Sequence, residues 1–295
     1  MATFYGINAI LMWGLLALLG SLTIDIPAFQ LLFICFLIST LIMFGRRFLR
    51  KEALFRLPTL KPSQWLIGTS GLFGFHFFYF MALKQAPVLE VSLIVYLWPL
   101  LLSVMIAARG QRFQAIIGGV VGFLGIVVII TSKGELNLSL ESTSGYLLAL
   151  LCALIWSSYS AYLAKSPGDI DDIGWISLAV ASLSLIAHLT LESGFSLNTA
   201  HWHFNSSAWL GAILLGLGPV GGAFYLWDQG LKRGNQSLLA SLSFCAPLIS
   251  SISLILAGQE QASMALVVAV ALIMFGGLIA NWRSKNVSIR ASDTL

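Results

Sequence analysis

Two sixteen-residue stretches, GLFGFHFFYFMALKQA at residues 71–86 and PVGGAFYLWDQGLKRG at residues 219–234, match each other at an offset of 148 positions. The same offset places Pro99 on Pro247. Since 148 is about half of the 295 residues, the match predicts two copies of one structural unit. The positions that agree within the two stretches are Gly74 with Gly222, Tyr79 with Trp227, Leu83 with Leu231 and Lys84 with Lys232.

The composition places both copies in a membrane. Apolar residues make up 58% of the chain, charged residues 9%, and the mean hydropathy is +0.90. The first apolar segment has no basic leader and no cleavage site, so we expect a retained helix. The chain has no G-x-x-x-x-G-K-[ST] loop, which argues against an ATP-driven pump within this one chain. A membrane span takes about 20 mostly apolar residues, and we predict ten of them: 4–22, 27–44, 65–83, 87–107, 113–131, 145–163, 173–190, 209–231, 235–257 and 262–281.

The lysines and arginines predict the orientation of these spans. With the N-terminus inside, 14 of the 16 basic residues fall on the inner side, and only Lys84 and Lys133 fall outside. Basic residues in short loops stay in the cytoplasm, so we predict a multi-pass protein of the bacterial inner membrane with both termini cytoplasmic. The net charge of +4 follows from this topology, and no nucleic-acid partner is needed to explain it.

Each copy of the repeat has five helices, which is an odd number, so the second copy sits upside down in the bilayer. The predicted fold is therefore an all-α integral membrane protein with ten transmembrane helices, arranged as two inverted five-helix repeats around a central cavity. We place the first repeat at residues 1–134 and the second at residues 135–295.

Six short motifs spread over most of the chain carry a resemblance to a known family. They are LMWG at 11–14, YFMALKQA at 79–86, YLWPLL at 96–101, LIWSSY at 154–159, LWDQGLKRG at 226–234 and FCAPLIS at 244–250. With them the chain resembles EamA-type members of the drug/metabolite transporter superfamily, and among these it is most similar to exporters of aromatic amino acids. The resemblance implies a cavity bounded by helices 1, 3, 4, 6, 8 and 9, with helices 5 and 10 beside it as support. It also implies export of small metabolites by alternating access.

The candidate binding site starts from His76, which lies among phenylalanines at bilayer depth. An ionisable group there is costly, so it usually faces the bundle interior or a polar path. The alternative is a neutral imidazole that bonds to a neighbouring hydroxyl. Tryptophans near the middle of their spans are the second signal, and interhelical packing is their alternative explanation. We predict that the substrate-binding residues are Trp13, His76, Tyr79, Tyr96, Trp98, Trp156, Tyr159, Tyr225 and Ser243.

Prolines and glycines within the spans predict kinks. A proline removes one donor and displaces the carbonyl four residues earlier, so Pro99 and Pro247 are predicted to kink helices 4 and 9. In helix 8 the run GLGPVGG, which contains Gly218 and Pro219, is predicted as a hinge, with close helix packing as the alternative. Gly118 has G-x-x-x-G spacing and predicts a packing face, either within the monomer or against a second copy.

The charged and sulfur-containing side chains complete the prediction. Asp228 precedes Lys232 by four residues, which favours an ordinary surface ion pair, and Glu90 is expected to be solvated at the outer end of helix 4. No carboxylate is predicted near the bilayer midplane, so proton-coupled and passive transport both stay open. Cys35, Cys152 and Cys245 fall within spans, and we expect free thiols and no metal site.

Two classes of function, a transporter and a membrane-embedded enzyme or lipid-handling protein, require different residues. A membrane-embedded enzyme or lipid-handling protein would need paired carboxylates or a histidine-rich cluster, and the sequence shows neither, so we expect a transporter that is not an enzyme and needs no cofactor. An aromatic site with few charges fits small zwitterions with apolar side chains, above all aromatic amino acids. The runner-up is a multidrug or other metabolite exporter of the same superfamily.

Overall fold

The computed structural model describes residues 1–136, 138–166, 168–193 and 204–281, and every regular element in these ranges is a helix. The first five spans comprise α1 (Ala2–Trp13), α2 (Leu16–Gly20) with the 3-10 turn η1 (Ser21–Thr23), α3 (Ala28–Leu49), α4 (Pro62–Leu83), α5 (Val88–Val95) with α6 (Trp98–Ile106), and α7 (Arg112–Thr131). A short turn, η2 (Arg109–Gln111), precedes α7.

The second five spans follow the turn η3 (Leu140–Ser142). They comprise α8 (Thr143–Leu163), α9 (Asp172–Ala187) with the π-helical turn η4 (His188–Glu192), α10 (Ser206–Leu217) with α11 (Gly222–Arg233), α12 (Gln236–Leu242) with η6 (Ser243–Cys245) and α13 (Ala246–Leu256), and α14 (Met264–Asn281). Within the described ranges nine spans are long and apolar enough to cross a membrane, and the bent pair of α1 and α2 makes the tenth. The predicted fold class is confirmed.

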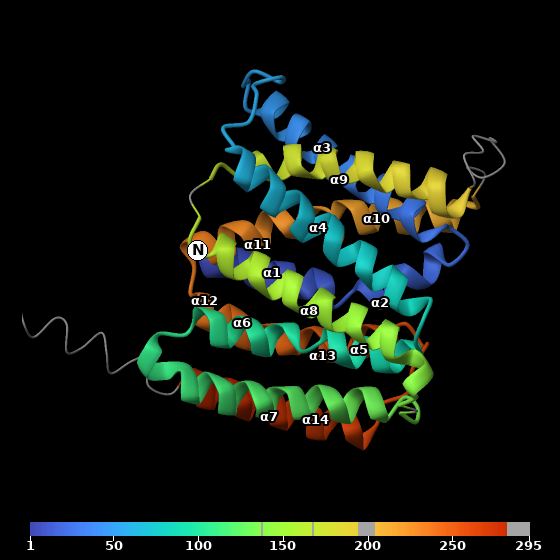
Figure 1. Ribbon diagram of the computed structural model, residues 1–295, viewed down its shortest axis with the longest axis vertical. Helices are drawn as coiled ribbons and strands as arrows, with labels where there is room; N and C mark the ends of the chain where they lie inside the picture. The colour runs from blue at the N-terminus through green and yellow to red at the C-terminus, as the bar shows by residue number, and fades with distance from the viewer. Residues whose placement is uncertain (137, 167, 194–203, 282–295) are drawn as a thin grey trace, which may run out of the picture.

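The ten spans form a bundle in layers (Figure 1). α7 and α14 lie side by side at one edge, α3 and α9 lie at the opposite edge, and α1, α8 and α11 lie between them. The connections after α3, α6, α8 and α11 lie at the same end as the N-terminus, and the connections after α4, α7 and α13 lie at the other end. We call these the N-terminal end and the far end of the bundle.

The contacts between helices follow the repeat. In span numbers, the fifth packs on the tenth (α7 with α14) and the second on the seventh (α3 with α9). The third span packs on the sixth (α4 with α8), and the first packs on the eighth (α1 with α11). Exchanging the two halves of the chain converts the third–sixth pair into the first–eighth pair and the reverse. It leaves the fifth–tenth and second–seventh pairs unchanged. This is the pairing expected of two inverted repeats.

The interruptions of the spans occur at the predicted prolines and at one further place. The fourth span breaks between α5 and α6 just before Pro99, and the ninth passes through η6 just before Pro247. The eighth span breaks at residues 218–221, where Gly218 has φ −109° and ψ −111°. The helices are therefore interrupted near Pro99, near Pro247 and at Gly218 and Pro219.

The bend of the first span corrects the prediction of one continuous helix over 4–22. α1 and α2 meet at 43° with no proline between them. Gly14 lies at the bend, and a Cβ at this position would collide with the side chain of Ile249 from α13. Ser253 of the same helix donates its hydroxyl to the Gly14 carbonyl, with an oxygen–oxygen distance of 3.4 Å. The cause of the bend is thus a distant helix that packs into the glycine.

The G-x-x-x-G face of α7 packs within the monomer. A Cβ at Gly118 would meet backbone atoms of Gly276 and Ala280 on α14, and a Cβ at Gly276 would meet backbone atoms of Gly118 and Gly122. The two helices are in backbone contact because neither presents a side chain at the crossing. The helices predicted to stand aside as support, the fifth and the tenth, therefore pack on each other.

Candidate functional site

The centre of the bundle is filled by aromatic rings. Four tryptophans and one phenylalanine form what we call the ring cluster: Trp13, Trp98, Trp156, Phe224 and Trp227. The ring centroid of Trp13 lies 5.0 Å from that of Trp227, 5.7 Å from that of Trp156, 6.1 Å from that of Trp98 and 6.4 Å from that of Phe224. The rings come from the first, fourth, sixth and eighth spans. Four of the six helices that the resemblance implied as the boundary of the cavity therefore contribute a ring to the cluster.

Two indole hydrogen bonds fix the ring cluster to the backbone and to a neighbouring helix. Trp13 donates its Nε1 hydrogen to the Pro219 carbonyl at 3.1 Å, which ties the bend of the first span to the break of the eighth. Trp227 donates its Nε1 hydrogen to the hydroxyl of Ser160 on α8, also at 3.1 Å. Buried indoles usually find such partners. The first of these bonds joins two interrupted helices at the same point.

His76 lies beside the ring cluster within a cage of phenylalanines. Its ring centroid is 5.1 Å from that of Phe75, 5.6 Å from that of Phe36 and 6.2 Å from that of Phe224. Its Nδ1 lies 2.7 Å from the carbonyl oxygen of Leu72 on the same helix. A carbonyl only accepts hydrogen bonds, so Nδ1 carries a proton and Nε2 is the acceptor of the neutral ring. The partner is thus a backbone carbonyl, where the alternative expectation was a neighbouring hydroxyl.

Tyr79 and Tyr96 lie in separate apolar clusters. Tyr79 packs at the cluster around Ala82, Val95 and Cys152, although its ring is also parallel to that of Phe75 at 6.2 Å. Tyr96 packs at the cluster that α7 and α14 form with Phe244. Both residues are partly exposed. The structure therefore brings neither of these predicted tyrosines into the ring cluster.

The hydroxyls of Tyr225 and Ser243 are taken up by backbone carbonyls. Tyr225 donates to the carbonyl of Ser39 on α3 at 2.6 Å, and Ser243 donates to the carbonyl of Leu239 in its own span at 2.8 Å. Both side chains are buried. Tyr159 differs, because its hydroxyl is buried and has no hydrogen-bond partner in the described part of the chain. Its ring lies 5.8 Å from that of Trp156.

Phe224 and Trp227 were missing from the sequence-based set of site residues. Trp227 has an exposed fraction of 1% and is one of the largest fully buried side chains. The sequence contains a signal for Trp227, since the offset of 148 places it on Tyr79, which is among the predicted site residues. Phe224 carried no such signal, because phenylalanines are frequent in every span.

Asp228 and Glu90 correct two expectations about charge. Asp228 pairs with Lys232 at 2.8 Å as predicted, but its exposed fraction is 0%, so the pair is buried where a surface pair was expected. Glu90 has an exposed fraction of 2% and is likewise not solvated, because the start of α5 packs against α8 and α7. Both carboxylates belong to the bundle interior. The three cysteines carry free thiols, as predicted.

A network of ion pairs closes the N-terminal end between α3, the α3–α4 connection and the α8–α9 connection. Arg46 and Arg47 both bind the carboxylate of Asp171, which is buried, and Arg56 binds Asp169 at 2.7 Å. Burial raises the pKa of Asp169, but the Asp171 amide and the Arg56 guanidinium outweigh this effect and hold the pKa below its usual value. These pairs fix the ends of helices that border the centre.

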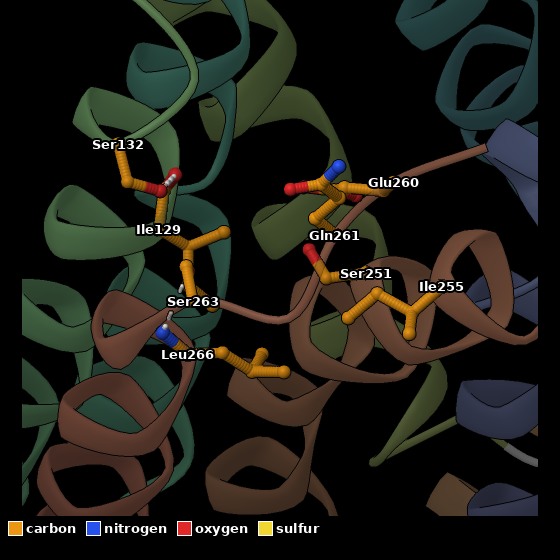
Figure 2. A pocket seen from close by; sticks show the side chains of 8 residues that line it. All are labelled: Ile129, Ser132, Ser251, Ile255, Glu260, Gln261, Ser263 and Leu266. Atoms are coloured by element: carbon orange, nitrogen blue, oxygen red, sulfur yellow. Dashed lines mark hydrogen bonds between the residues drawn. The ribbon is translucent and has the colours of Figure 1, made fainter. Parts of the chain in front are cut away.

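Two of the cavities in the described part of the chain lie outside the ring cluster. One, of ≈ 600 Å³, lies at the N-terminal end and is lined by the start of α4, the end of α8 and the α8–α9 connection, including Lys61, Tyr162 and Lys165. The other measures ≈ 10 Å³ and lies at the far end between Ile129 of α7, Ser251 of α13 and the segment leading into α14 (Figure 2). It has room for about one water molecule, so it is too small for a metabolite.

Comparisons with known proteins place the chain in a family of transporters. The sequence matches the EamA-like transporter family over residues 1–131 and 143–282. It is 40% identical over 286 residues to the aromatic amino acid exporter YddG of Ancylobacter novellus, with coverage of 95% of this chain and 96% of that protein. The YddG exporter of Salmonella typhimurium is 27% identical over 66% of this chain and 70% of its own length.

The fold agrees with this assignment. A solved crystal structure with 38% sequence identity superposes with a TM-score of 0.84, and the match covers 95% of this chain and 97% of that chain. The apolar spans and the family match together establish a multi-pass membrane protein. The chain therefore belongs to the EamA-like transporter family.

Proposed function

We propose that the protein exports aromatic and other neutral amino acids across the bacterial inner membrane by alternating access. The observation that carries this proposal is the ring cluster, which lies where the interrupted first, fourth and eighth spans meet. The names of the two exporters described above support the same substrate class.

The chemistry of the centre suits an apolar zwitterion. Aromatic pairs with offset or edge-to-face geometry contribute about 0.5–1.5 kcal/mol beyond their buried area, and the rings of Trp13 and Trp156 stand at 80° to each other. A substrate ring that enters between them can replace these contacts with its own. His76 and Tyr159 are ionisable side chains whose rings contact the cluster, at Phe224 and Trp156. A multiply charged substrate would lack partners there.

The paired interruptions provide a route to alternating access. Pro99 and Pro247 break repeat-related spans, and the Trp13 bond to the Pro219 carbonyl joins the other two breaks. Broken helices are tolerated in a membrane where protein or a cavity satisfies the freed backbone groups. Rotation of one repeat against the other about these breaks would expose the ring cluster to one side at a time.

The test is exchange of labelled phenylalanine in liposomes that contain only this protein. We expect labelled phenylalanine to accumulate in vesicles preloaded with unlabelled phenylalanine, and recovery of chemically unchanged amino acid. Trp156→Ala, which removes a ring that packs against Trp13, Trp98 and Phe224, should abolish most of the exchange, while protein-free vesicles give the background. Exchange of cationic dyes without exchange of phenylalanine, tryptophan or threonine would instead support a multidrug exporter.

A further inference from the structure

Asp228 and Lys232 form a buried ion pair one helical turn from the ring cluster. Both lie on α11, four residues apart, with 2.8 Å between Oδ1 and Nζ and with side-chain exposed fractions of 0% and 11%. The second carboxylate oxygen accepts a hydrogen bond from Gln229 at 3.2 Å. Phe224 lies four residues before Asp228 and therefore on the same face of the helix. Asp228 thus lies one turn from Phe224, and Lys232 lies one turn further along the same face.

An unpaired hydroxyl faces the same region from α8. The Trp227 bond to Ser160 joins α11 and α8 at this level, and the neighbours of these two residues are Asp228 and Tyr159. Tyr159 has an exposed fraction of 4%, and its hydroxyl has no hydrogen-bond partner among the described residues. A buried hydroxyl without a partner costs free energy, which indicates a partner that arrives with a ligand.

The ion pair also borders the cavity at the N-terminal end. A Cβ at Gly168 would lie 2.8 Å from Nζ of Lys232, so the ammonium group touches Gly168. Gly168 lines the ≈ 600 Å³ cavity together with Tyr162 and Lys165. Tyr162 follows Tyr159 by one turn of α8. Along α11 the ion pair therefore lies between the cavity and the ring cluster.

We propose that Asp228, Lys232 and the Tyr159 hydroxyl form the subsite that binds the charged head of an amino acid. This inference rests on the proposed function and names the groups that recognise its substrate. The substrate ammonium binds Asp228 and the Tyr159 oxygen, the substrate carboxylate binds Lys232, and the apolar side chain enters the ring cluster. Each head group replaces one half of the internal ion pair, so binding leaves no uncompensated buried charge.

The experiment compares three ligands that share a phenyl ring and differ in charge. Phenylalanine carries both groups, 2-phenylethylamine carries the ammonium alone, and 3-phenylpropionate carries the carboxylate alone. Binding to the purified protein is followed by tryptophan fluorescence, since the four indoles of the ring cluster report a ligand between them. Lys133→Gln and Glu260→Gln are the matched controls, because this pair at 3.0 Å lies at the far end of the bundle.

Each substitution should affect only the ligands that carry its partner group. Lys232→Met should weaken phenylalanine and 3-phenylpropionate at least tenfold and change 2-phenylethylamine less than threefold. Asp228→Asn should weaken phenylalanine and 2-phenylethylamine at least tenfold and spare 3-phenylpropionate. An equal loss for all three ligands, or no loss for any of them, overturns the subsite. Should the parent bind none of the three, the proposed function itself is overturned.

Tyr159→Phe tests the same proposal if Lys232→Met or Asp228→Asn does not fold. It leaves the ion pair and the ring in place and removes only the hydroxyl. We expect weaker binding of phenylalanine and 2-phenylethylamine, unchanged binding of 3-phenylpropionate, and a ligand-free Tm equal to or above that of the parent, because an unpaired buried hydroxyl is lost. A lower Tm with unchanged ligand selectivity would show a structural role for the hydroxyl and overturn the proposal.

Discussion

The side chains at the centre of the bundle bond mainly to backbone carbonyls, and this separates their effect on folding from their effect on a ligand. His76 uses the Leu72 carbonyl of its own helix, and Trp13 uses that of Pro219. The Leu72 carbonyl lies within α4 and keeps its helical hydrogen bond when the His76 side chain is removed, whereas the Pro219 carbonyl lies in the break of the eighth span. Substitution of His76 should therefore change ligand contacts more than stability.

His76→Ala should weaken phenylalanine exchange tenfold or more and change Tm little. The substitution removes a polar ring from the phenylalanine cage, and a site that leaves one buried ligand group unpaired loses about 1–3 kcal/mol. The measurement is the exchange rate in liposomes, with Tm from thermal unfolding. Ser70→Ala is the matched control, since Ser70 also bonds to the carbonyl four residues earlier on α4 but is exposed. Equal rates in the two variants would exclude His76 from the binding site.

At this scale the sequence predicted some of the central residues and missed others for a physical reason. Trp13, Trp98 and Trp156 stood out because mid-span tryptophans are rare, and the structure places all three in the ring cluster. Tyr225 did not join them, because the side of α11 on which a residue lies depends on the break at 218–221. The burial of Asp228 could not be predicted from the sequence either, since it results from the packing of α8 and α11.

The interrupted helices determine which backbone groups reach the centre. Proline explains two of the interruptions, and these were predictable from the sequence because proline lacks the amide hydrogen that a helix requires. The bend at Gly14 was not predictable, because it depends on Ile249 and Ser253 of a helix more than 200 residues away in sequence. Local sequence thus predicts the helix breaks that proline causes. A bend at a residue that could continue the helix depends on tertiary contacts.

Pro247→Ala should slow exchange more than it weakens binding. Alanine supplies the missing amide hydrogen, so η6 and α13 can join into one stiffer helix. We expect a several-fold lower exchange rate and a phenylalanine Kd within about twofold of the parent. Pro58→Ala, in the α3–α4 connection, is the control. A large loss of affinity with an unchanged rate would assign Pro247 to ligand binding and not to motion.

Gly118→Ala should destabilise the pairing of α7 with α14. The added Cβ would meet backbone atoms of Gly276 and Ala280, which cannot rotate away as a side chain can. Overpacking of this kind costs about 1–3 kcal/mol, so Tm should fall by several degrees. Gly45→Ala on α3 is the matched control, because no atom lies within 4 Å of its Cβ position and alanine favours a helix. Equal Tm values would show that the two helices separate readily.

In the whole molecule, the two halves of the chain build one centre from complementary parts. The first half supplies Trp13, His76 and Trp98, and the second supplies Trp156, Phe224 and Trp227. The pairs of α1 with α11 and of α4 with α8 each join one helix from either half. The sequence could predict this arrangement because an offset of 148 and an odd number of helices per copy together require an inverted pair. The closure of the centre by rings was not predictable, since it depends on the conformation of the bundle.

The distribution of charge over the bundle predicts its orientation in the membrane. The N-terminal end carries Arg46 and Arg47 in the last turn of α3 and Arg56 and Lys61 in the α3–α4 connection, whereas Lys84 and Lys133 lie in connections at the far end. Of the other basic residues on the predicted inner side, Arg283, Lys285 and Arg290 lie outside the described residues. Because basic residues in short loops are retained in the cytoplasm, the N-terminal end should face inward.

Single cysteines at Lys61 and Lys133 test this orientation, on a background in which Cys35, Cys152 and Cys245 are replaced by alanine. Both positions lie in connections, and they belong to opposite ends of the bundle. We expect an impermeant maleimide to label Lys133→Cys in intact spheroplasts and Lys61→Cys only after the membrane is opened. Labelling of Lys61→Cys alone in intact spheroplasts would invert the topology and, with it, the direction in which the ≈ 600 Å³ cavity opens. Labelling of both would contradict the ten-span bundle itself, because three spans lie between the two positions and an odd number of crossings places them on opposite sides of the membrane.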